Sequence, residues 1–182
     1  MIESKVDRSV HRLMIGVIAA ALIVSILFAP SAKARTRHIG LGWWYGETID
    51  PVTRQGTSFI ARAAKGHLDN GSGAGLMIVC QSDVKTLGLA IDWNEFIGSG
   101  GFVEVVLQVD ERASITSPSW YVDRSTSSIF DEGAQEIVNE MRQGKRTMHA
   151  RIDDEGGKTH ALAFDLSGFE EAILQVSGHC KD

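Results

Sequence analysis

The side chains that could carry out hydrolysis form no recognisable motif in this chain of 182 residues. A nucleophile needs a base beside it and a third group that orients the base. The chain has no Gly-x-Ser-x-Gly segment, and Gly98-Ser99-Gly100 lies in an expected turn without the flanking pattern. We therefore name no catalytic residue. A hydrolase stays open as an alternative, because a triad is assembled in space rather than along the sequence.

Histidine and carboxylate side chains likewise give no metal-binding pattern. A zinc site needs several such groups that converge, and the tempting pair is His149 and His160 on an expected hairpin. If Met148 and Phe164 point into the core, His149 points outward and His160 inward, on opposite faces. Neighbouring carboxylates at 110–111, 131–132 and 153–155 fall in expected turns or at a helix start, where solvated charge is the usual role. We expect no metal ligand and no cofactor.

Contiguous aromatic residues are a better indication of a functional surface. Trp43, Trp44 and Tyr45 lie together in one expected strand, and Trp120 and Tyr121 lie together in another. Successive side chains of a strand point to opposite faces, so each group places at least one aromatic ring away from its neighbour. Trp and Tyr are favoured at binding surfaces. Two interpretations stay open: a binding surface formed by these five residues, or a core on both faces of a sheet.

Alternation of apolar and polar residues predicts that β-strands carry most of these side chains. Strands are expected at 43–49, 57–64, 76–80, 87–93, 102–109, 120–123, 147–152 and 162–166, with loops at 66–75 and 98–101. Helices are expected at 131–143, capped by Asp131, and at 168–176, capped by a Ser167–Glu170 box. The predicted fold class is mainly β with short helices (α+β). It comprises an antiparallel sandwich- or barrel-like sheet with one helix before and one after a C-terminal hairpin.

The first 34 residues have the order of a secretory signal peptide. Lys5, Arg8 and Arg12 precede an apolar run at 13–28, and the small-x-small pattern Ala32-Lys33-Ala34 follows it. The alternative is an uncleaved membrane anchor, since about 20 residues are enough to span a bilayer. Residues 35–42 are expected to be a flexible lead-in, and 43–182 a single exported domain.

The exported part is acidic and contains both cysteines. The whole chain has 18 Lys+Arg and 23 Asp+Glu, of which residues 1–34 hold 4 and 2, leaving 14 against 21 and a net charge of about −7. An acidic surface argues against nucleic acid as the partner. Cys80 and Cys180 are expected to pair, because thiols in an oxidising compartment tend to form disulfides. The alternative is two buried free thiols.

Segments along most of the exported part resemble the VasI family, accessory proteins encoded with type VI secretion systems, and related prophage-encoded exported domains. The residues that carry the resemblance are Trp44, Asp50-Pro51, 76–80, 89–93, 103–110, Trp120, Phe130, Ala172-Ile173 and Cys180, and above all Ala163-Phe164-Asp165-Leu166-Ser167-Gly168. Gln108 stands where the family usually has an arginine. The resemblance implies an envelope-facing accessory protein without established chemistry, and it implies no catalytic residues.

These observations lead us to expect a non-enzymatic periplasmic or secreted protein that binds a protein partner in the cell envelope. The first alternative is a secreted inhibitor or binding module that acts on a partner enzyme or a cell-wall ligand. The second alternative is the unrecognised hydrolase. We expect a membrane partner only if the N-terminal segment is uncleaved, in which case the protein is anchored in the inner membrane and faces the periplasm.

Overall fold

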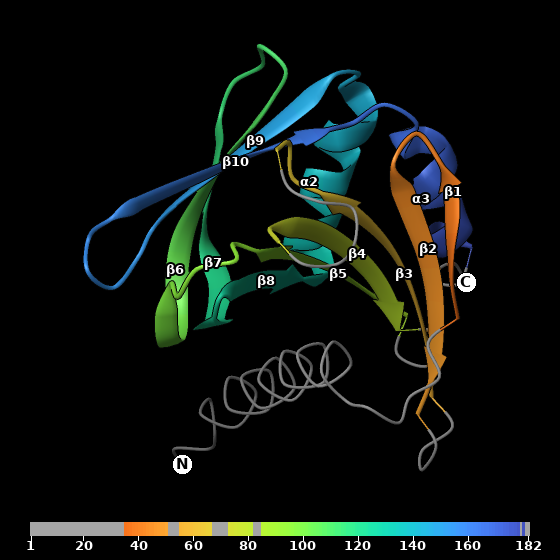
Figure 1. The fold of residues 1–182 in the computed structure, drawn as a ribbon, viewed down its shortest axis with the longest axis horizontal. Coiled ribbons are helices and arrows are strands. Elements are labelled where there is room, and N and C mark those ends of the chain that lie inside the picture. The colour runs from red at the N-terminus through yellow and green to blue at the C-terminus, as the bar shows by residue number, and fades with distance from the viewer. Residues whose placement is uncertain (1–34, 51–54, 67–72, 82–84, 179, 181–182) are drawn as a thin grey trace, which may run out of the picture. The chain divides into compact units, whose positions relative to one another are not determined.

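Antiparallel strands build almost all of the structure, a computed structural model that describes residues 35–50, 55–66, 73–81, 85–178 and 180 (Figure 1). The described residues form ten strands: β1 Arg35–Gly40, β2 Trp43–Ile49, β3 Gly56–Ala63, β4 Gly75–Gln81, β5 Thr86–Asp92, β6 Gly98–Val109, β7 Ile115–Arg124, β8 Thr126–Phe130, β9 Thr147–Asp153 and β10 Thr159–Asp165. They form one sheet in the order β1-β2-β3-β4-β5-β8-β7-β6-β9-β10. The predicted signal peptide, its cleavage point and the centre of the predicted 66–75 loop lie outside the described residues.

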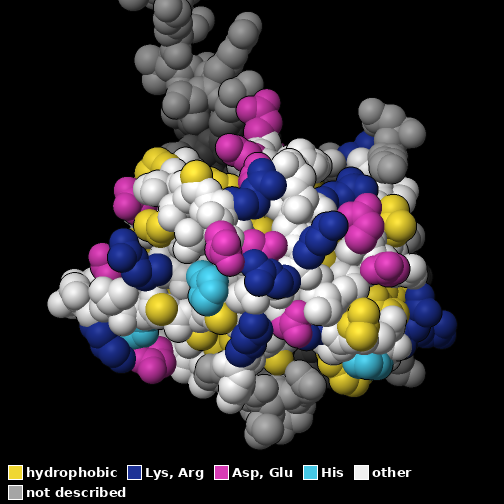
Figure 2. All heavy atoms as spheres, turned by 90° about the horizontal axis from the view of Figure 1, so that it is seen from above, with side chains coloured by type: hydrophobic (Ala, Val, Ile, Leu, Met, Phe, Trp, Pro, Cys, Tyr) yellow, Lys and Arg dark blue, Asp and Glu magenta, His cyan; other side chains and the backbone are white. Residues whose placement is uncertain are grey.

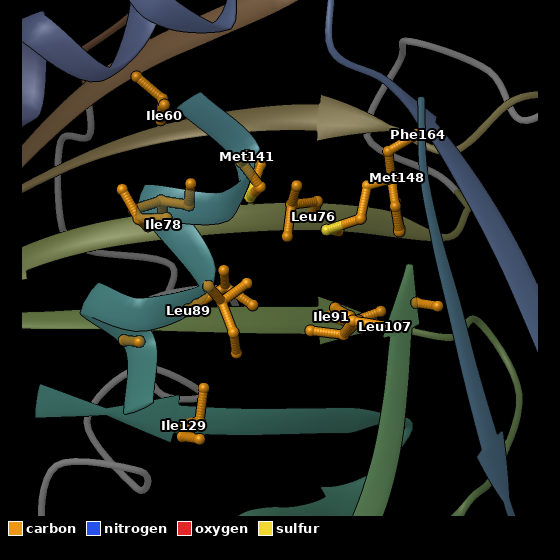
Figure 3. Packing of buried hydrophobic residues seen from close by; sticks show 14 of the residues in the cluster. Ile60, Leu76, Ile78, Leu89, Ile91, Leu107, Ile129, Met141, Met148 and Phe164 are labelled. Atoms are coloured by element: carbon orange, nitrogen blue, oxygen red, sulfur yellow. The ribbon is translucent and has the colours of Figure 1, made fainter. Parts of the chain in front are cut away.

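The helices α2 (Asp131–Gln143) and α3 (Phe169–Ser177) pack on one face of this sheet, which we call the inner face. The sheet curves around α2 (Figure 1). Tyr45, Ile60, Ile78, Leu89 and Ile129 are register partners across five strands and are all buried. Figure 3 shows the last four beneath α2. The predicted core positions of Ile60 and Leu89 are therefore confirmed.

The predicted apolar stripes of both helices are confirmed. The buried residues are Ala134, Ile137, Val138 and Met141 in α2, and Phe169, Ala172, Ile173 and Val176 in α3. The helices lie before and after the β9–β10 hairpin, as expected. The fold class, mainly β with short helices in an α+β arrangement, is therefore confirmed, in a sandwich-like form whose sheet stays open with β1 and β10 at its ends.

Both predicted helix caps are wrong. The cap of α2 is Phe130, without a side-chain hydrogen bond, and Asp131 is the first helical residue, with a positive φ of 57°. The cap of α3 is Gly168 with φ of 75°, also without a side-chain hydrogen bond. Ser167 lies one residue earlier, where its backbone N–H donates to Asp165 Oδ1 at 2.9 Å. The chain enters α3 through a left-handed glycine, so the hydroxyl of Ser167 is not at the capping position.

Four segments differ from the predicted strands. Residues 35–40 form β1 instead of a flexible lead-in, because their backbone pairs with β2. Residues 98–101 start β6 instead of forming a turn, and β7 extends back to Ile115. Strand β8 was not predicted, because its Thr-Ser-Ser sequence is polar. In the structure Trp93 Nε1 donates to Ser127 Oγ at 3.0 Å, and this hydrogen bond satisfies a serine buried in the centre of the sheet.

Candidate binding surface

The polar side chains that were considered for catalysis form hydrogen bonds with neighbouring groups of the fold. Ser99 Oγ and its backbone N–H both donate to Glu155 Oε1, at 2.9 Å and 2.6 Å, so this serine joins β6 to the β9–β10 turn. Within the described ranges, no three His, Cys, Asp or Glu side chains are grouped so that they could hold a metal ion. The arrangement around Ser99 therefore stabilises a turn and shows no orienting third group.

His160 lies between two carboxylates at the edge of the core. Its Nε2 is 2.9 Å from Asp154 Oδ2, and its Nδ1 is 3.4 Å from Glu95 Oε2. The hydrogen bond with His160 and the backbone N–H of Lys158 lower the pKa of Asp154. A hydrogen bond from Lys158 lowers the pKa of Glu95. His149 is exposed on the other face, so the predicted opposite orientation of the two histidines is confirmed.

The carboxylate of Asp110 also has a structural role. Its two oxygens accept the backbone N–H groups of Lys145, Arg146 and Thr147 at 2.9, 3.1 and 2.8 Å. These backbone hydrogen bonds, led by that of Lys145, lower the pKa of Asp110. The predicted role of Asp110 and Asp154 as solvated turn charge is therefore incomplete, because both anchor neighbouring backbone.

Three of the five aromatic residues predicted as a binding surface belong to the core. Trp43 and Trp120 are 0% exposed and Tyr45 is 7% exposed. Trp43 Nε1 donates to the Ser167 carbonyl at 2.9 Å, and burial raises the pKa of Tyr45 to about 12. These side chains point to the inner face and belong to the buried core, so the prediction of a surface role is wrong for them. Trp44 and Tyr121 are half-buried on the opposite, outer face.

Trp44 and Tyr121 belong to one line of side chains across the outer face, which we call the outer row. Its members are successive register partners on eight strands: His38, Trp44, Ala61, Met77, Ala90, Ser128, Tyr121 and Phe102. The His38 and Trp44 rings meet edge to face at 5.3 Å between centroids, and the Phe102 and Tyr121 rings do so at 5.9 Å. Phe102 is 60% exposed. The row thus offers large rings at both of its ends.

A second line of apolar side chains flanks the outer row. Phe59 lies over Gly46, and Phe130 lies over Gly88, where an added Cβ would come within 2.7 Å of Phe130 Cε1. Val79 lies between them in register and is buried, although it is not part of the inner core cluster. Glycine on a strand next to a cross-strand aromatic lets the ring lie flat on the sheet. The outer face therefore has its own packed apolar layer, which no described helix covers.

Sequence reasoning did not name Phe102, Phe59 or Phe130 as surface residues. The alternation of β6 already placed Phe102 on the face opposite Val103 and Val105. The missing information was which face the helices cover, and that depends on packing between distant segments. For the same reason, the sequence could not separate Trp43 from Trp44 as core and surface.

Other parts of the described surface are weaker candidates for a binding site than the outer row. A hollow of about 450 Å³ lies between the start of β5 and α2 and is lined by Leu87, Asp131, Glu132 and Glu136 among others. Its acidic side chains are spread along an open helix face instead of converging on one point. Figure 2 shows basic and acidic side chains interspersed on the face seen from above, without a large field of one sign.

The predicted disulfide is present. Cys80 at the end of β4 is bonded to Cys180 beyond α3, with an S–S distance of 1.97 Å and a Cα–Cα distance of 5.8 Å. Cys80 is fully buried, so the bond joins the last helix to the centre of the sheet. The alternative of two free thiols does not hold.

The Ala163–Gly168 segment, on which the family resemblance most depends, is a structural junction. Asp165 Oδ2 is 3.3 Å from Arg62 Nη2 on β3, and the Ser167 carbonyl accepts the Trp43 indole hydrogen bond. Backbone and hydroxyl hydrogen bonds from Ser167 lower the pKa of Asp165. At Gly168 an added Cβ would meet the side chain of Leu41 at 2.8 Å. The Asp165 carboxylate and the Ser167 carbonyl thus fix the end of β10 and the start of α3 against β3 and β2.

Comparisons of the chain with protein-family models, with characterised proteins and with solved structures give no match in any of the three. Among the helices of the described residues, none has the length and apolar character needed to cross a membrane.

Proposed function

We propose that this protein is a non-enzymatic, exported accessory protein that binds a protein partner in the cell envelope through the outer row. The observation that carries the proposal is the partly exposed aromatic layer on the outer face. Its half-buried Trp44 and Tyr121 and exposed Phe102 are the residue types that dominate protein–protein recognition. The inner face instead holds the buried core and the two helices that pack on it.

Two further features support an exported binding protein. A disulfide is characteristic of proteins that fold in an oxidising compartment, which favours the periplasm or the cell exterior. In this proposal residues 1–34 are a cleaved signal peptide, and the alternative is an anchor that leaves the domain facing the periplasm. The resemblance to the VasI family suggests a component of a type VI secretion system as the partner.

The polar chemistry of the described residues favours binding over catalysis. Ser99, His160 and Asp154 all have structural partners that hold the β9–β10 turn. The acidic balance of residues 35–182 disfavours nucleic acid, since binding to phosphate depends mainly on Lys and Arg. A protein partner therefore fits these observations better than a hydrolase substrate or a nucleic acid does.

Site-specific photocrosslinking in the native host tests the proposal. A photoreactive phenylalanine analogue at Phe102 should give one dominant adduct, identified by mass spectrometry. The same analogue at His149, which is exposed on β9, is the matched control and should not give that adduct. The Phe102 adduct should disappear when Tyr121 is changed to Glu in a protein that still folds.

Equal adducts at both positions, or none at Phe102, would contradict the proposal. If the adduct is an enzyme that the purified protein inhibits, the secreted-inhibitor alternative replaces the accessory role. Hydrolysis by the purified protein that is lost in Ser99→Ala would instead favour the hydrolase.

A further inference from the structure

The two edge strands of the sheet differ in how far they are covered. The backbone N–H of Lys65, just after β3, donates to the Ala163 carbonyl of β10 at 2.7 Å. The nearby ion pair between Arg62 and Asp165 adds a second link from β3 to β10. The curvature of the sheet thus lets β3 cover part of the β10 edge. At the opposite edge, no strand of the described residues pairs with the outer side of β1.

Strand β1 is basic and exposed. Its sequence Arg-Thr-Arg-His-Ile-Gly contains no acidic residue, and its first four side chains are exposed. Arg37 lies over the Tyr45 ring at 5.0 Å and donates to Gln175 Oε1 of α3 at 3.0 Å. Arg35 is the register partner of Glu47 on β2. Both arginines therefore belong to the inner side of β1, whereas His38 starts the outer row.

The positive charge of β1 favours some kinds of additional strand over others. In an antiparallel pair with a second copy, the arginines of both β1 strands would gather across the new interface. Like charges opposite each other in a sheet are destabilising, and charged edges are a common protection against self-association. An extended segment with acidic side chains on the same side would instead meet Arg35 and Arg37 with opposite charge. On its other side, the segment would continue the outer row beside His38 and Trp44, where apolar side chains fit.

We propose that β1 accepts an extended segment of the protein partner as an additional strand, and that this segment alternates acidic residues with apolar or aromatic ones. The acidic residues lie on the side of Arg35 and Arg37, and the apolar residues extend the outer row. Backbone hydrogen bonds supply binding energy and the alternating side chains supply specificity, as in other cases of strand addition. This inference rests on the proposed function, because it names the chemistry of the partner that the outer row binds.

Binding of short synthetic peptides to the purified protein tests the inference. The probe is a peptide in which Glu alternates with Val and Phe, labelled for fluorescence anisotropy, and the control replaces each Glu with Lys. We expect the Glu peptide to bind at least about tenfold more tightly than the Lys peptide, with a difference that shrinks as salt screens the charges. Hydrogen exchange of the backbone amides of β1 should slow when the Glu peptide binds.

Two N-methylated forms of the Glu peptide separate strand addition from side-chain docking. One carries methyl groups on the Glu nitrogens and the other on the nitrogens of the apolar residues. Because alternate residues of an added strand face the edge, only one of the two forms should lose binding. If both bind like the parent, or if the Lys peptide binds as well as the Glu peptide, strand addition to β1 is wrong.

Protein variants complete the test. Arg35→Glu with Arg37→Glu should weaken binding of the Glu peptide by about tenfold or more. Arg151→Glu, a single charge reversal at an exposed position of β9, should not weaken it. Unchanged binding in the double variant would also overturn the inference. The peptide comparisons need no variant, so they stand even if the double variant folds poorly.

Failure of the Glu peptide with persistence of the Phe102 adduct would reject the strand addition alone, whereas loss of that adduct would reject the proposed function.

Discussion

Replacing Cys180 with Ser removes a cross-link whose effect can be worked from the structure. The bond to Cys80 joins residues 100 positions apart. In the chain-entropy model, closing a loop of that length constrains the unfolded chain by about 4 to 5 kcal/mol at 25 °C. Part of this is not realised in practice, so we expect Cys180→Ser to lower the free energy of unfolding by a few kcal/mol. Cys180 is only partly buried, which limits any added cost of burying the serine hydroxyl.

The loss should begin at α3. This helix has nine residues, too few to persist by helix propensity alone. Its attachment depends on four buried side chains and on the disulfide that follows it. Without the disulfide, α3 should open more often than the sheet, and its amides should lose hydrogen-exchange protection first.

Urea unfolding followed by tryptophan fluorescence measures the global effect, and hydrogen exchange with mass spectrometry measures the local one. Strand β4 serves as the internal reference, and reduced wild-type protein is the matched control. If Cys180→Ser unfolds at the same urea concentration as oxidised wild type and retains protection in α3, the reasoning about this tether is wrong. Thiol labelling of unreduced, unfolded wild type must first show no reactive cysteine.

Substitutions at other positions give further testable predictions. Ile173→Asp places an unpaired charge in the core and should lower the free energy of unfolding by about 3 to 5 kcal/mol. This loss should appear as a large fall in Tm. An unchanged Tm would mean that this side of α3 is not buried. Gly88→Ala should cost about 1 to 3 kcal/mol because the new Cβ meets the Phe130 ring, whereas Gly75→Ala, with 3.4 Å to its nearest neighbour, should cost less. The pKa of Asp110 is lower in the folded state, so its contribution to stability is present above its unfolded pKa of about 3.9 and is lost as pH falls through the folded value. Asp110→Asn should therefore flatten the dependence of Tm on pH in that acidic range, and parallel profiles for both proteins would refute the assignment.

Much of the fold followed from the sequence because its main elements have regular apolar periodicity. The β9–β10 hairpin and both helices were predicted within a few residues, since each buries one clear apolar side. Strand β8 was missed because its sequence is polar, and its buried Ser127 is stabilised by a hydrogen bond from Trp93 rather than by apolar character. Strand β1 was missed because an edge strand with exposed arginines has no apolar alternation to detect.

The candidate surface was predicted only in part, for a different physical reason. Adjacent residues of a strand point to opposite faces, so Trp43 and Trp44 lie on different faces of the sheet. Which one is exposed depends on where α3 docks, and α3 lies more than 120 residues later in the chain. Phe102, 60% exposed, lies on the outer face, whereas Trp120, which precedes its register partner Tyr121, is buried in the core.

The most direct test of the central claim is the affinity of the crosslinked partner, once purified, for the Phe102→Ala variant. Phe102 is 60% exposed, so truncating it should leave the fold intact. If the outer row binds the partner, affinity should fall by about tenfold, equivalent to about 1.4 kcal/mol. Leu174→Ala removes a similarly exposed apolar side chain from α3 and should leave the affinity unchanged. Equal affinities for wild type and Phe102→Ala, or a loss confined to Leu174→Ala, would contradict binding through the outer row.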